Sequence, residues 1–92
     1  MNIWKTFKYI RKNELDKRRH RCQVFFYISK FRFCKIAYGD SLMSLIIELR
    51  KKKWIVYRID ERGGIHDSQE YESESEACEE YLIILRYFKQ IK

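Results

Sequence analysis

Seven carboxylates within fourteen residues give the C-terminal half of the chain an acidic region. They are Asp67, Glu70, Glu72, Glu74, Glu76, Glu79 and Glu80. Paired carboxylates can transfer protons or bind a metal ion. No second polar cluster in the sequence converges on this region, so neither chemistry is indicated. A contiguous acidic face would instead attract a basic partner and speed its association.

Cysteine and histidine are the other candidates for chemistry. The three cysteines are odd in number, irregularly spaced and without a C-x-x-C pair, which favours a reducing cytoplasm. His20, Cys22 and Cys34 could begin a zinc site, but the sequence offers no obvious fourth ligand. Cys78 could be a nucleophile with His66 as its base, yet it falls on an apolar stripe beside glutamates that would raise its pKa. We therefore predict no enzymatic activity, cofactor or metal ion.

Phosphate and small-molecule chemistry is also not indicated. The segment Arg62-Gly63-Gly64-Ile65 is rich in glycine, but it lacks the lysine and the following helix of a phosphate-binding loop. No small-molecule substrate is expected.

The net charge of +7 is unevenly distributed. Residues 1–53 contain 15 Lys/Arg and 4 Asp/Glu, whereas residues 54–92 contain 5 Lys/Arg and 9 Asp/Glu. Eight of the cations lie between Lys5 and Arg21, interleaved with Trp4, Phe7 and Tyr9. Nucleic-acid surfaces need such cations and stacking rings. An amphipathic helix with a solvated basic face explains the pattern equally well, so nucleic-acid binding is kept as an alternative function.

The chain length and composition indicate one domain spanning residues 1–92. There are 3 Gly, no Pro, no internal repeat and no linker-like segment. No apolar run approaches the ~18 residues of a transmembrane span, and the N-terminus lacks the apolar core of a signal peptide. We expect a cytoplasmic protein that does not bind membranes.

The N-terminal half allows two readings. The spacing of Ile3, Phe7 and Ile10 predicts a short amphipathic helix, which either ends near Asn13 or continues through residues 14–21. Residues 22–38 are rich in aromatic and β-branched types, which predicts two short strands meeting near Ser29-Lys30. A helix through residues 14–28 is the alternative.

The C-terminal half gives a clearer order of elements. After a Gly39-Asp40 turn, alternating apolar residues predict a half-buried strand over 43–50. Residues 54–60 read as a central strand, Gly63-Gly64 as a tight turn with positive φ values, and 65–71 as a polar edge strand. Ser73 and Glu76 form a capping-box pattern. The helix that follows has an apolar stripe of Ala77, Cys78, Tyr81, Leu82, Leu85, Phe88 and Ile91.

Together these elements predict an α+β fold, in which a small antiparallel β-meander is packed by an N-terminal helix and a C-terminal amphipathic helix. Losing the Ser73 cap should cost roughly 1 kcal/mol.

The last thirty residues resemble small bacterial immunity proteins of polymorphic or contact-dependent toxin systems. The resemblance lies in Trp54-Ile55-Val56-Tyr57, in Asp60-Glu61-Arg62-Gly63, and in Ser73-Glu74-Ser75-Glu76-Ala77-Cys78. It implies that the chain binds a cognate toxin domain and neutralises it by occlusion. It also implies mainly structural roles for the motif residues: Trp54 and Tyr57 in the core, Gly63 in the turn, Ala77 and Cys78 in helix packing. The charges suggest a toxin-binding set of Asp67, Glu70, Glu72, Asp60 and Glu61.

Overall fold

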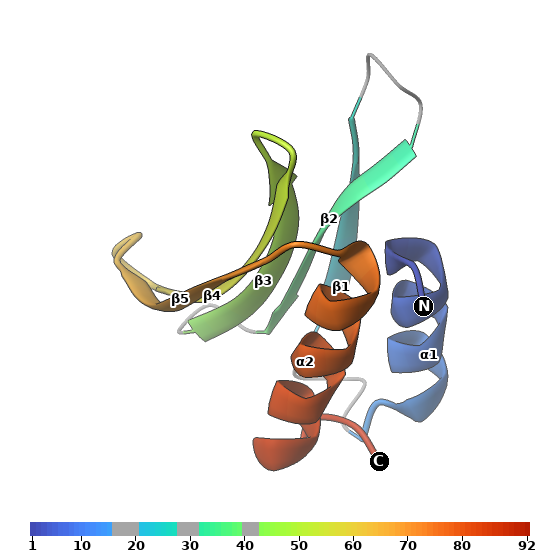
Figure 1. The fold of residues 1–92 in the computed structure, drawn as a ribbon. Helices are drawn as coiled ribbons and strands as arrows, with labels where there is room; N and C mark the ends of the chain where they lie inside the picture. Colours follow the sequence, from blue (N-terminus) through green and yellow to red (C-terminus); the bar gives the residue numbers. More distant parts are fainter. Residues whose placement is uncertain (16–20, 28–31, 40–42) are drawn as a thin grey trace.

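The computed structural model of the chain describes the backbone of residues 1–15, 21–27, 32–39 and 43–92. It describes the side chains of residues 1–15, 35–39 and 43–92. One helix precedes five consecutive strands and a second helix follows them, which confirms the predicted α+β fold class. Figure 1 shows the two helices side by side on one face of a curved sheet. The elements in chain order are α1 (Ile3–Asn13), β1 (Arg21–Tyr27), β2 (Arg32–Gly39), β3 (Met43–Arg50), β4 (Lys53–Asp60), β5 (Ile65–Tyr71) and α2 (Glu74–Tyr87).

The sheet is an antiparallel meander with the strand order β1-β2-β3-β4-β5. β4 therefore lies centrally and β5 at an edge, as predicted. Two of the predicted alternatives are wrong: α1 ends at Asn13, and residues 21–27 form a strand rather than part of a helix. The turn expected near Ser29-Lys30 lies outside the described residues.

One face of the sheet carries the main core. Cross-strand partners point to the same face of a sheet, and Ile36, Ile47 and Val56 form such a row beneath the helices. α1 contacts β1 and β2, while α2 contacts β3, β4 and β5. Trp54 is 7% exposed and belongs to this core, which confirms its predicted burial.

The opposite face of β3 is also buried at its centre, which the prediction of a half-buried strand did not include. Ile46 and Glu48 are 4% and 9% exposed, and Tyr57 of β4 is 5% exposed beside them. Tyr57 is thus buried as predicted, but on the face away from the helices.

Both helices begin with a side-chain cap, of which only the one at Ser73 was predicted. Asn2 Oδ1 accepts a hydrogen bond from the Lys5 amide at 2.8 Å, and Ser73 Oγ accepts one from the Glu76 amide at 3.1 Å. The Glu74 carboxylate accepts from the Ile3 amide at 2.6 Å, which ties the starts of the two helices together. None of the described helices is long and apolar enough to cross a membrane.

The end of α2 departs from the predicted stripe. The helix ends at Tyr87, so Phe88 and Ile91 lie beyond it. Lys89 adopts a left-handed φ of 57°, and the amides of Lys89 and Gln90 donate to the carbonyls of Arg86 and Leu85. This is the hydrogen-bond pattern that ends a helix at a left-handed residue. Ile91 returns to the core, 3% exposed, whereas Phe88 is left 46% exposed.

Candidate functional site

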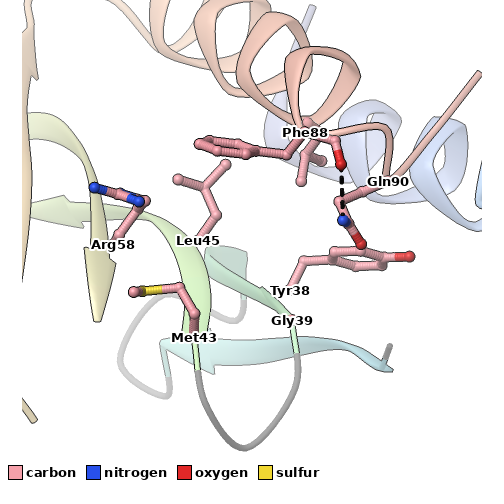
Figure 2. A pocket seen from close by; sticks show the side chains of 8 residues that line it. Tyr38, Gly39, Met43, Leu45, Arg58, Phe88 and Gln90 are labelled. Atoms are coloured by element: carbon pink, nitrogen blue, oxygen red, sulfur yellow. Dashed lines mark hydrogen bonds between the residues drawn. The ribbon is translucent and has the colours of Figure 1, made fainter. Parts of the chain in front are cut away.

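A groove lies between the end of α2 and the strands β3 and β4. We call it the Phe88 groove, because Phe88 stands between its two hollows, which also share Leu45 and Arg58. The first hollow has a volume of about 210 Å³ and is also lined by Tyr38 and Met43 (Figure 2). The second has about 320 Å³ and extends toward Asp67, Ile83 and Tyr87.

Hydrogen bonds hold the walls of this groove in place. The Tyr81 hydroxyl donates to the Leu45 carbonyl at 2.7 Å, which fixes α2 against β3. Phe88, at the C-cap of α2, lines the groove (Figure 2). The groove therefore lies where the end of α2 meets β3 and β4.

Large apolar side chains are exposed around the groove. Ile83 is 53% exposed, Tyr87 79%, Phe88 46% and Met43 38%. Isolated exposed apolar residues are ordinary, but a contiguous group of them is typical of a protein-binding surface. Tyrosine, phenylalanine and methionine are also enriched at such interfaces.

A charged pair lies within this apolar surface. Arg58 of β4 donates a hydrogen bond to Oδ2 of Asp67 on β5, and its guanidinium lies 5.8 Å from the centre of the Phe88 ring. The Asp67 side chain is 69% exposed, whereas that of Arg58 is 31% exposed. Asp67 is the member of the predicted toxin-binding set that the structure brings to the groove.

A β-bulge lies at Asp67. Arg58 pairs with His66 and Val56 with Gln69, so Asp67 and Ser68 together oppose Tyr57. Asp67 has a left-handed φ of 55°. A regular strand would send consecutive side chains to opposite faces, but the extra residue lets both His66 and Asp67 lie on the helix side.

The other predicted carboxylates lie elsewhere. Glu70 pairs with Ile55, and so lies on the face opposite the helices. The Lys53 ammonium lies 3.6 Å from Glu70 and 3.8 Å from Glu72. The predicted contiguous acidic face of Asp67, Glu70 and Glu72 is therefore divided between the two faces of the sheet, as ordinary alternation along β5 requires of positions 67 and 70.

Asp60 organises the hairpin between β4 and β5. Its Oδ1 accepts hydrogen bonds from the amides of Arg62 and Gly64 at 2.9 and 2.8 Å, and its Oδ2 lies 2.8 Å from His66 Nε2. The bond to His66 and those two amide bonds lower the pKa of Asp60. These contacts give the carboxylate a structural role in the hairpin.

The turn itself differs in detail from the prediction. Gly63 has a positive φ of 85°, but Gly64 does not. A Cβ atom at Gly64 would lie 2.7 Å from Asp60 Oδ2, so a larger residue there would displace the carboxylate that organises the hairpin. Glu61 is exposed at the turn.

Glu48 is the centre of a polar cluster on the face away from the helices. The Tyr57 hydroxyl donates to its Oε1 at 2.9 Å, Arg50 donates to the same oxygen at 2.5 Å, and the Lys35 ammonium lies 3.6 Å from Oε2. Burial, followed by the contact with Glu48, raises the pKa of Tyr57 to about 12. These partners satisfy a buried carboxylate, which would otherwise be costly.

The residues considered for catalysis do not meet. Cys78 is 0% exposed in the core, and burial raises the pKa of its thiol. His66 is bound to Asp60 in the exposed hairpin. Among the described residues, no group of three or more His, Cys, Asp or Glu side chains could hold a metal ion. His20 and the side chains of Cys22 and Cys34 lie outside the described part of the chain.

The outer face of α1 is strongly basic. Lys5, Lys8, Arg11 and Lys12 are exposed, and none of them forms an ion pair with a carboxylate among the described residues. Trp4 is 41% exposed, stacks on Phe7, and has the Lys8 ammonium 5.7 Å from its ring centre.

Several groove residues were missed at the level of sequence. Ile83 and Tyr87 lie four residues apart, and so fall on one side of α2, beside the predicted stripe. Large apolar residues outside a helix's buried stripe were the available signal for an interaction surface. Arg58 gave no such signal, because its position in the groove depends on the register of β4 with β5.

Comparison with known proteins adds no family assignment. No protein-family model matches the sequence, and neither a curated protein nor a solved structure gives a significant match.

Proposed function

We propose that this protein is an immunity-type protein, which binds a cognate bacterial toxin domain through the Phe88 groove and neutralises it by occlusion. The observation that carries the proposal is the group of exposed apolar side chains around the Arg58–Asp67 pair. Aromatic and arginine anchors of this kind dominate the energetics of protein interfaces. The class of partner comes from the resemblance of the C-terminal thirty residues to immunity proteins.

Occlusion suits the chemistry of the groove. The thiol of Cys78 is buried and His66 is engaged by Asp60, so neither is arranged to act on a substrate. A binding protein needs only a rigid surface, and the bond from Tyr81 to Leu45 holds the groove's two sides together. Binding through preformed walls avoids part of the entropy cost of ordering an interface.

The proposal is tested by identifying a partner and then measuring rescue. The tagged protein is used to capture partners from its native, nuclease-treated lysate, and the toxin-like domain of any stoichiometric partner is expressed in a sensitive host. Co-expression of the wild-type protein should restore growth. An Ile83→Ala/Tyr87→Ala double variant should fold but lose rescue, since both side chains are exposed.

Trp4→Ala is the matched control, because it removes a large exposed ring from α1 rather than from the groove. It should rescue growth as well as the wild type. Full rescue by the groove double variant, or absence of any toxic partner, would contradict the proposal.

A second function is favoured by the basic outer face of α1. Four exposed cations on α1, beside an exposed tryptophan, match what single-stranded nucleic acid requires of a binding surface. This function predicts an affinity for oligonucleotides that falls steeply with salt and is reduced by Trp4→Ala. Binding of the wild type that is insensitive to salt would contradict it.

A further inference from the structure

Asp67 has a left-handed backbone conformation at the bulge in β5. Its φ of 55° lies in the left-handed region, where a side chain is strained and glycine is favoured. Asparagine and aspartate tolerate this region better than most residues. The bulge nevertheless uses a residue with a charged side chain where glycine would be easier to accommodate.

At this bulge a carboxylate enters an apolar groove. Asp67 lines the same hollow as Val56, Phe88 and Tyr87. Bulges often redirect a side chain beside a functional site, and backbone strain tends to be kept where function needs it. Asp67 alternates with Gln69, which pairs with Val56 on the helix side, and the extra residue brings His66 to that side as well.

The exposed carboxylate has unused capacity for hydrogen bonds. An ionised aspartate can accept bonds at both oxygens. Arg58 occupies Oδ2, and no other described side chain bonds this carboxylate. Arg58 itself faces inward over the Phe88 ring, so the charge offered to solvent at the groove is chiefly that of Asp67.

We propose that the Phe88 groove receives a basic segment of the partner protein, in which a large apolar side chain packs against Phe88 and an adjacent arginine or lysine pairs with Asp67. This inference rests on the proposed function for the identity of the partner. Charge complementarity decides the occupant: an acidic segment would meet the Asp67 carboxylate with like charge, which disfavours binding.

Two blocked dipeptides of opposite charge test the groove directly. N-acetyl-phenylalanyl-arginine amide and N-acetyl-phenylalanyl-glutamate amide are titrated into the ¹⁵N-labelled protein, and amide shifts are followed by NMR. The arginine probe should shift the amides of Arg58, Asp67 and Phe88, and should bind about three- to five-fold more tightly than the glutamate probe, as expected for an exposed ion pair.

Asp67→Asn keeps a residue that tolerates the left-handed conformation and removes the charge, so it should abolish the preference. Glu79→Gln, which neutralises an exposed carboxylate on α2, is the matched control and should retain it. Equal affinities for the two probes, a preference that survives in Asp67→Asn, or shifts confined to other surfaces would overturn the proposal.

Asp67→Gly provides a readout that does not depend on binding. It should raise the melting temperature by on the order of 4 °C by relieving the strain, while losing the preference for arginine. A lower melting temperature would show that Asp67 is kept for folding, and would overturn the assignment. If the groove binds the arginine probe selectively but no toxin partner is found, the inference about the groove is supported and the proposed neutralising function is rejected. The two proposals can therefore fail separately.

Discussion

The hydrogen bond between Tyr57 and Glu48 gives a prediction whose size can be worked out from the structure. Tyr57→Phe removes a hydroxyl that donates at 2.9 Å to a carboxylate only 9% exposed. The ring is retained, so no large cavity forms. A hydrogen bond to a charged group is worth about 1.5–3 kcal/mol. Since Arg50 and Lys35 still neutralise Glu48, we expect a loss of about 2 kcal/mol in the free energy of unfolding at pH 7.

The same bond makes the effect depend on pH. Burial and Glu48 raise the pKa of Tyr57 from its usual 10 to about 12, so the folded state holds the proton more tightly than the unfolded state. The stability that this contributes is complete below about pH 10 and is lost as the pH rises toward 12. The loss reaches about 1.4 kcal/mol by pH 11 and at most about 2.7 kcal/mol. The phenylalanine variant has no proton to lose, so its deficit should shrink over this range.

Urea denaturation of both proteins at pH 7, 9, 10 and 11 checks this prediction. Comparing the two proteins at each pH cancels the other tyrosines, including Tyr71, whose pKa is raised by burial and by the nearby Glu80 and Glu76. Tyr87→Phe is the matched control, because that side chain is 79% exposed and should show no deficit. A deficit below about 0.5 kcal/mol at pH 7, or one that stays constant to pH 11, would refute the reasoning.

Three further predictions concern stability. Lys51 and Lys52 both have positive φ values, 51° and 68°. The double substitution Lys51→Asn/Lys52→Gly should therefore raise the free energy of unfolding by about 1–2 kcal/mol. An unchanged urea midpoint would contradict this. Trp54→Ala should lower it by about 3–5 kcal/mol because the ring is core, and an unaltered melting temperature would disprove that role. Asp60 has a lowered pKa, so its contribution is present above about pH 4 and is lost as the pH falls through the lowered value. Asp60→Asn should remove that acid dependence and speed hydrogen exchange at the Gly64 amide; unchanged exchange would argue against the hairpin role.

The elements with strong local signals were predictable. Ser73 caps α2, and the turn containing Gly63 joins a central to an edge strand, as the sequence indicates, whereas the end of α1 at Asn13 was one of two predicted boundaries. Each depends on residues within a few positions of one another: a cap, a turn or a short alternation. Such patterns can be recognised in a short stretch of sequence, because the hydrogen bonds of a cap or a turn join residues that are close together in the chain.

The predicted site was only partly recovered, because the prediction of one acidic face did not apply the alternation of side chains along β5. Positions three apart in a strand lie on opposite faces, as Asp67 and Glu70 do. The bulge, and the approach of Asp67 to Arg58, are seen only in the tertiary structure. The end of α2 had the same difficulty: the apolar spacing continues to Ile91, whereas the left-handed turn at Lys89 ends the helix earlier. Phe88 lies just beyond the helix, 46% exposed, and lines both hollows of the groove.

The sequence by itself determined the order of the helices and strands, most of the residues buried beneath the helices, and the charge asymmetry between the two halves of the chain. Those properties follow from residue types and short-range periodicity. Only the tertiary structure decided which charges share a face, which apolar residues remain exposed, and that Arg58, Asp67 and Phe88 meet in one groove. That meeting depends on strand register and on where a helix stops, and both are decided by contacts between residues distant in the chain.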